Sequence, residues 1–125
     1  MNIRVATSQF ATIKDNFESN LNKAIKLIED AAKENVDILL LQELFLDNYF
    51  CSTKNDKFFN LAIDFPSNPM FEKLSNICKN KNISLPISFF QQDGGKYFNS
   101  LVMIDSNGEY SEVYHKSHIP EGIGY

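Results

Sequence analysis

Several side chains of types that carry chemistry follow predicted strands, and Glu43 is the first of them. It comes directly after residues 36–42, a near-continuous apolar run that is typical of a strand buried on both faces. Ligands of open α/β sheets tend to bind beyond the carboxyl ends of strands. A carboxylate at such a position can exchange protons with a bound substrate, so Glu43 is a candidate functional residue. Lys116 also follows a predicted strand, although a single lysine before a loop is most often a surface charge.

Three residues near the C-terminal end have side chains of the types that bind metal ions. His115, His118 and Glu121 follow one another at intervals of three residues. Pro120 and the neighbouring glycines place this stretch in a loop, so helical spacing does not align the three side chains. We therefore predict no metal here.

The two cysteines, Cys51 and Cys78, are too few to form a disulfide framework. Cys78 falls at helical spacing with Leu74 and Phe71, which favours a buried, unreactive thiol. Cys51 lies in the loop that follows Glu43.

The elements that must position these residues follow from periodicity. Residues 3–9 alternate as a strand, and Asp15 with Glu18 has the spacing of a capping box at the start of a helix. Apolar residues at helical spacing continue from there to residue 32. With the strand at residues 36–42, this order predicts a right-handed crossover and a parallel strand pair.

The second half of the chain predicts another helix and three strands. Asn68 and Pro69 form a helix-start signal. Residues 83–89 alternate as a strand, in which Pro86 favours an edge position or a bulge. Strands at residues 97–104 and 109–115 then form a hairpin, and residues 47–60 form a loop with weak helical character.

Composition places the chain in an ordinary class. Hydrophobic residues make up 43% and charged residues 22%, which predicts a single globular domain with one core. The net charge of −4 gives no support to a nucleic-acid partner. The longest apolar run, residues 38–41, is far too short to span a membrane. We expect a cytoplasmic protein whose partner is a small molecule.

Five short motifs resemble one enzyme superfamily. Gln42-Glu43-Leu44-Phe45 and the stretch from Tyr114 to Pro120 resemble the first two signatures of the nitrilase superfamily of carbon–nitrogen hydrolases. Phe98-Asn99-Ser100 also fits its pattern. Tyr49-Phe50-Cys51 and residues 120–125 are similar to the branch that hydrolyses N-carbamoylputrescine. Each motif is weak alone, but their order, spacing and structural context are specific, and the resemblance as a whole spans residues 5–125.

The resemblance implies an α/β fold, the N-terminal part of a four-layer αββα sandwich, with a Glu–Lys–Cys triad. Glu43 would be the general base and acid, and Lys116 would stabilise the oxyanion. The nucleophilic cysteine would lie in a later segment, so residues 1–125 would be an incomplete domain and inactive alone. His118 and Glu121 would bind substrate, with Glu121 receiving a cationic amine. The resemblance implies no cofactor, and a homo-oligomer at full length.

The expected reaction converts N-carbamoylputrescine to putrescine, carbon dioxide and ammonia, a step of polyamine biosynthesis. Two alternatives remain open: a truncated, non-catalytic fragment with an uncovered apolar sheet face, or a related hydrolase of another linear amide, a nitrile or a ureido acid. The chain also departs from the branch at two positions. It has Gln91 where glutamate is frequent and His115 where arginine is frequent.

Overall fold

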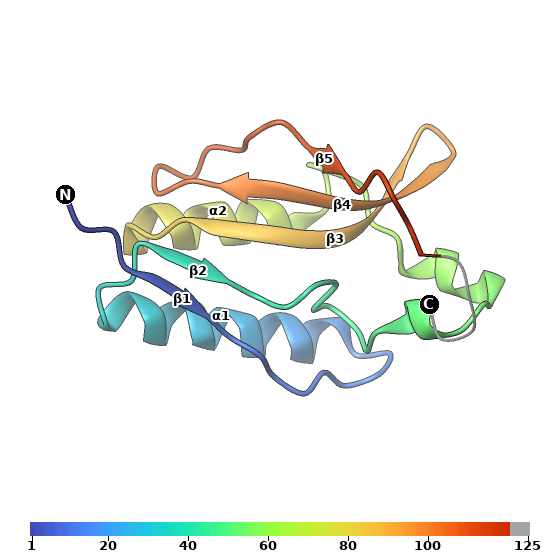
Figure 1. Cartoon of the computed structure of the whole chain (residues 1–125), viewed down its shortest axis with the longest axis horizontal. Coiled ribbons are helices and arrows are strands. Elements are labelled where there is room, and N and C mark those ends of the chain that lie inside the picture. Colours follow the sequence, from blue (N-terminus) through green and yellow to red (C-terminus); the bar gives the residue numbers. More distant parts are fainter. Residues whose placement is uncertain (121–125) are drawn as a thin grey trace.

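The computed structural model describes residues 1–120, which form a layer of strands covered by helices (Figure 1). In chain order the elements are β1 (Val5–Thr7), α1 (Phe17–Lys33), β2 (Ile38–Leu40), the 3-10 helices η1 (Phe50–Ser52) and η2 (Asp56–Leu61), α2 (Pro69–Lys81), β3 (Leu85–Asp93), β4 (Lys96–Ile104) and β5 (Tyr114–His115). This order confirms the predicted sequence of elements, including the weak helical character of residues 47–60. Neither α1 nor α2 is long and apolar enough to cross a membrane.

The strands form two short sheets that join into one layer. β1 pairs with β2 in parallel, as the strand–helix–strand order predicted. β3, β4 and β5 are antiparallel neighbours. A bridge between Ile38 and Ser84 links β2 to β3, with Leu39 N–H donating to the Ser84 carbonyl over 3.1 Å. Pro86 lies in β3, which is the terminal strand of the three-stranded sheet but has β2 beside it in the joined layer, so the predicted edge position holds only within the three-stranded sheet.

The start of α1 differs from the prediction by one residue. Asn16, rather than Asp15, is the N-cap, and its side-chain oxygen accepts from Ser19 N–H over 3.1 Å. Asp15 adopts a left-handed conformation with φ 55°, and its N–H donates to the carboxylate of Asp47. The predicted capping box of Asp15 and Glu18 is therefore wrong, because a long-range contact uses Asp15 instead. α2 begins as predicted, with Asn68 as the N-cap and Pro69 at the first position.

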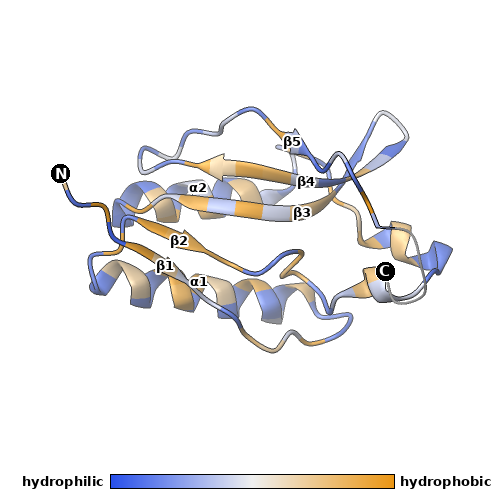
Figure 2. Ribbon diagram, viewed as in Figure 1, coloured by the Kyte–Doolittle hydropathy of each residue, from blue (hydrophilic) through white to orange (hydrophobic). Residues whose placement is uncertain are grey.

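Both helices pack on the same face of the strand layer, and their apolar sides meet the strands there (Figure 2). The fully buried side chains of this core come from α1, α2, β3, β4 and the residues between them: Ala24, Ile28, Phe45, Phe71, Leu74, Cys78, Ile83, Leu85, Ile87, Phe89, Val102 and Ile104. Alternate residues of β3 are buried, which is the pattern of a strand with one covered face.

The opposite face of the strand layer is open among the described residues. Leu40 is 43% exposed although its neighbour Leu39 is 2% exposed, so the prediction that β2 is buried on both faces is wrong. Val5, Leu101 and Tyr114 are exposed as well. The periodicity of a short apolar run cannot tell which of its faces is covered. This open face is the one that the fragment hypothesis anticipated.

The last strand is shorter than expected. Residues 109–115 were expected to pair throughout, but β5 contains only Tyr114 and His115, and Tyr110 makes an isolated bridge to Ile104. Between them, the Ser111 side-chain oxygen accepts from Met103 N–H over 3.0 Å. A side chain therefore replaces a backbone acceptor in the ladder, which interrupts the strand.

Two glycines of the turns allow a matched stability test. A Cβ at Gly108 would lie 2.8 Å from Ser75 Oγ at φ 83°, whereas a Cβ at Gly95 would meet nothing within 4 Å at φ 76°. We expect Gly95→Ala to cost about 1–2 kcal/mol of unfolding free energy through backbone strain alone. Gly108→Ala should cost more, because Ser75 must also move. Urea unfolding of both variants checks this, and equal losses would contradict it.

Candidate active site

Glu43 lies between two anchored residues at the end of β2. Gln42 ties this segment to the one after β1, since its Nε2 donates to the Phe10 carbonyl over 2.6 Å and its Oε1 accepts from Phe10 N–H over 3.2 Å. Leu44 adopts a left-handed conformation with φ 53°, although its side chain is buried. Its N–H donates to Ser88 Oγ over 3.1 Å. Strained residues of this kind cluster at functional sites, and here the turn sets the direction of the Glu43 side chain.

Lys116 is placed by the short strand β5. Its N–H donates to the Asn99 carbonyl over 2.8 Å, which extends the ladder between β4 and β5 by one bond. His115 precedes it, and its ring stacks on Phe98 at a centroid distance of 3.9 Å and an interplanar angle of 10°. The backbone of Lys116 is thus fixed on its N-terminal side.

The two side chains meet. Lys116 Nζ lies 3.1 Å from Glu43 Oε1, and Asn99 Nδ2 donates to the same oxygen over 2.7 Å. The side chains of Glu43 and Lys116 are 41% and 35% exposed, so both remain accessible. Residues 73 positions apart are therefore brought into one ion pair by the shared strand layer. Their catalytic roles stay predictions.

The contacts of this pair set its ionisation. Burial acts to raise the pKa of the Glu43 carboxyl, but the hydrogen bonds from Asn99 and Lys116 outweigh it, so the net pKa shift is downward. The pKa of the Lys116 ammonium is raised, chiefly by its hydrogen bond to Glu43. Glu43 is therefore an anion at neutral pH and can accept a proton. The ion pair would be lost as the pH falls through the lowered pKa of Glu43.

Cys51 lies near the pair, which its place in the sequence did not reveal. It lines the same cavity as Lys116 and Asn99. Burial, followed by the negative charge of Glu43, raises the pKa of its thiol despite the opposite effect of Lys116. At neutral pH Cys51 therefore stays a thiol, which is a poor nucleophile. Burial raises the pKa of Cys78 to about 12, in keeping with its predicted place in the core.

Two cavities adjoin the pair, and Asn99 and Lys116 line both. One of about 460 Å³ lies on the open sheet face, where Glu43, Ser88, Leu101 and other side chains surround it. The other, of about 230 Å³, is lined largely by aromatic and apolar side chains: Leu44, Tyr49, Phe50, Phe59, Phe90, Tyr97, Ile119 and Pro120. A substrate at the ion pair can therefore extend into an apolar space.

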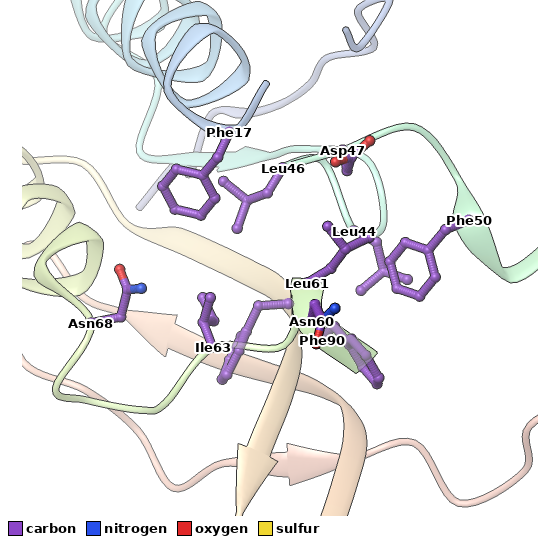
Figure 3. A pocket seen from close by; sticks show the side chains of 11 residues that line it. Phe17, Leu44, Leu46, Asp47, Phe50, Asn60, Leu61, Ile63, Asn68 and Phe90 are labelled. Atoms are coloured by element: carbon purple, nitrogen blue, oxygen red, sulfur yellow. The ribbon is translucent and has the colours of Figure 1, made fainter. Parts of the chain in front are cut away.

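A third cavity, of about 250 Å³, adjoins the aromatic one and is shown in Figure 3. Leu44, Phe50 and Phe90 form the wall that the two share. Phe17 and Leu46 also line it, and Asp47, Asn60 and Asn68 are its polar members. It contains neither Glu43 nor Lys116, so we assign the chemistry to the first two cavities.

The structure describes only one of the two predicted substrate-binding residues. His118 is exposed. Glu121 lies outside the described residues, and with it the predicted contact to a cationic amine. Among residues 1–120, no three potential metal-ligating side chains gather into a cluster.

Sequence reasoning gave no role to Asn99, although it lies in the quoted Phe98-Asn99-Ser100 motif. The adjacent polar residues Asn99 and Ser100 in the middle of β4 were the available signal. The two departures from the related branch also meet in space. His115 Nε2 donates to the buried Gln91 Oε1 over 3.0 Å, and Ser100 Oγ donates to the same oxygen over 2.7 Å. A hydrogen bond thus joins the two departing positions.

Comparisons with known proteins point to one family. Residues 4–125 match the carbon–nitrogen hydrolase family. The chain is 36% identical over 123 residues to an N-carbamoylputrescine amidase of Solanum lycopersicum, covering 98% of this chain and 41% of that protein. It is 42% identical over 124 residues to a citrullinase of Francisella tularensis, covering 99% of this chain and 43% of that protein.

A solved structure shows the same fold. The crystal structure of a carbon–nitrogen hydrolase from Helicobacter pylori superposes with a TM-score of 0.81 at 30% sequence identity, covering 97% of this chain and 41% of that one. The described residues thus have the nitrilase fold in its N-terminal part. The chain spans about two fifths of the length of the relatives that it matches.

Proposed function

Because the chain belongs to the carbon–nitrogen hydrolase family, we propose that it is the N-terminal part of an enzyme that hydrolyses a terminal carbamoyl group on a linear substrate. The observation that carries the proposal is the Glu43–Lys116 ion pair, accessible beside two cavities. In this proposal the nucleophilic cysteine comes from residues beyond these 125, since neither Cys51, in the loop after Glu43, nor the buried Cys78 matches the position that the family resemblance implies.

The proposed reaction has two halves, and Glu43 takes and then returns one proton in each of them. Glu43 takes the proton from the thiol while sulfur attacks the carbamoyl carbon, and Lys116 stabilises the oxyanion that forms. The carbon–nitrogen bond then breaks, and Glu43 returns the proton to the leaving nitrogen. Water next attacks the S-carbamoyl intermediate, with Glu43 again taking a proton and returning it to sulfur, and the carbamic acid that is released loses carbon dioxide to free the second nitrogen. The proposed steps use side chains and water.

The aromatic cavity favours a substrate with a short hydrocarbon chain. Tyr49, Phe59 and Tyr97 line it, and Phe59 packs on Tyr97 with their ring centroids 4.4 Å apart. Ring faces attract cations as well as methylene groups. A putrescine chain ends in an ammonium, so N-carbamoylputrescine is our first candidate. In this proposal Glu121, next to Pro120 of the cavity wall, receives that ammonium.

Citrulline is the second candidate, because the citrullinase shares 42% identity with the chain. Both substrates carry a carbamoyl group at the end of a short chain. They differ at the other end, where citrulline adds a carboxylate to the amine. A carboxylate beside Glu121 would be repelled, which favours the first candidate.

Ammonia release by the complete protein tests the proposal. We expect kcat/KM for N-carbamoylputrescine to exceed that for citrulline by about tenfold or more, the effect of about 1.4 kcal/mol. In Glu121→Gln this preference should fall, whereas it should persist in the control Glu29→Gln on the exposed side of α1. A preference for citrulline would select the second candidate. Ammonia from neither substrate would overturn both.

A further inference from the structure

Asn99 contacts both members of the ion pair. It lies in β4 opposite Phe90 of β3, so the strand ladder fixes its backbone. Its carbonyl accepts the N–H of Lys116 over 2.8 Å, and its side-chain amide donates to Glu43 Oε1 over 2.7 Å. One residue therefore sets both the place of the lysine backbone and the place of the carboxylate.

The hydrogen bonds to Glu43 are unequal between its two oxygens. Asn99 Nδ2 and Lys116 Nζ both bind Oε1. Neither Asn99 nor Lys116 binds Oε2. Two donors on a single oxygen stop the carboxylate from rotating, and they leave the second oxygen with its proton-accepting capacity unused.

We propose that Asn99 is a positioning residue that, together with Lys116, holds Oε1 of Glu43 and so reserves Oε2 for proton exchange with the nucleophile. This inference rests on the proposed function for its catalytic part only. The use of Oε1 for anchoring and of Oε2 for proton exchange gives the polar side chain of Asn99 in β4 a function. Asn99 also separates the two cavities, because it lines both of them.

The charged and titratable groups around Glu43 favour an uncharged hydrogen-bond donor at the position of Asn99. Lys116 from the end of β5 is the cation that faces it, and Cys51 of η1 is the neighbouring thiol. Tyr49, just before η1, contributes to the electrostatic effects that raise the pKa of Lys116. A second cation in place of Asn99 would weaken the carboxylate further as a base. An amide donates one hydrogen bond without adding charge.

The first experiment titrates Glu43 in the 125-residue chain. Carbon-13 NMR of its side-chain carboxyl, assigned with Glu43→Gln, gives the midpoint in wild type, Asn99→Asp and Asn99→Ala. Asn99→Asp keeps the shape of the side chain but removes the donor, so the fold should persist. We expect both variants to titrate at higher pH than wild type. Asn22→Ala, on the exposed side of α1, should leave the midpoint unchanged. An unchanged midpoint in both Asn99 variants would overturn the proposal.

The second experiment uses the complete protein and separates positioning from binding. We expect Asn99→Asp to lower kcat by roughly 10–100-fold with little change in KM, and to move the acidic limb of the kcat/KM profile to higher pH. A rise in KM at unchanged kcat would overturn the proposal. If the complete protein hydrolyses no carbamoyl substrate, the proposed function fails, while the titration still decides whether Asn99 anchors Oε1.

Discussion

Replacing Glu43 with glutamine is expected to lower kcat of the complete hydrolase by about 10²–10⁴-fold, the range for losing a general acid–base. Glutamine can keep an oxygen in the place of Oε1, so the hydrogen bonds from Asn99 and Lys116 can persist. It cannot take a proton from a thiol. The loss should therefore appear in kcat without a loss of fold. Steady-state ammonia release measures it, and thermal unfolding shows whether stability is retained.

The matched control for this variant is Glu29→Gln, which makes the same change at an exposed position of α1. It should retain full activity. Wild-type activity should also fall as the pH drops through the lowered pKa of Glu43, because protonation removes the base. Activity of Glu43→Gln within about threefold of wild type, well outside the loss expected for a general base, would remove Glu43 from the mechanism.

Phe71→Ala should have the largest effect on stability, with a loss of about 3–5 kcal/mol of unfolding free energy. The Phe71 ring is fully buried and meets Phe65 and Phe89 edge-on, with centroid distances of 4.8 and 4.9 Å. The substitution removes these contacts and leaves a cavity between α2 and β3. Urea unfolding followed by circular dichroism measures the loss.

Two further variants keep that prediction testable. Phe71→Leu retains most of the buried volume and should cost about 1–2 kcal/mol, even if the alanine variant does not fold. Phe59→Ala removes a ring that is 45% exposed and should cost about 1 kcal/mol, since its packing on Tyr97 is the main loss. A loss at Phe59 as large as that at Phe71 would contradict the assignment of the core.

The helices and the hairpin were predictable because their signals are local. Asn68 and Pro69 mark the start of α2, and the alternation of residues 83–89 shows which side of β3 is buried. The start of α1 was misassigned because Asp15 binds Asp47, 32 positions away. The exposure of Leu40 was missed for a similar reason. Whether a second layer covers β2 is decided by distant chain, which a seven-residue window does not contain.

The candidate site also has a part that local sequence signals predicted and a part that depends on long-range contacts. The ends of two predicted strands placed Glu43 and Lys116 near each other in advance, since strands of one layer end at shared edges. The role of Asn99 depends on a hydrogen bond across 56 positions and on the register of the hairpin. The left-handed turn at Leu44 was equally hidden, because leucine has no propensity for that conformation and Ser88 supports it from β3.

The ion pair also has a consequence for the order in which a site is assembled. Glu43, Asn99 and Lys116 all lie within the first 116 residues, and their side chains meet in the structure. A ribosome releases the N-terminal part of a polypeptide first, and compact units fold as they emerge. In a longer protein, the proton-handling half of the catalytic centre could thus be finished before the nucleophile is synthesised. The reactive thiol would then arrive at a prepared partner.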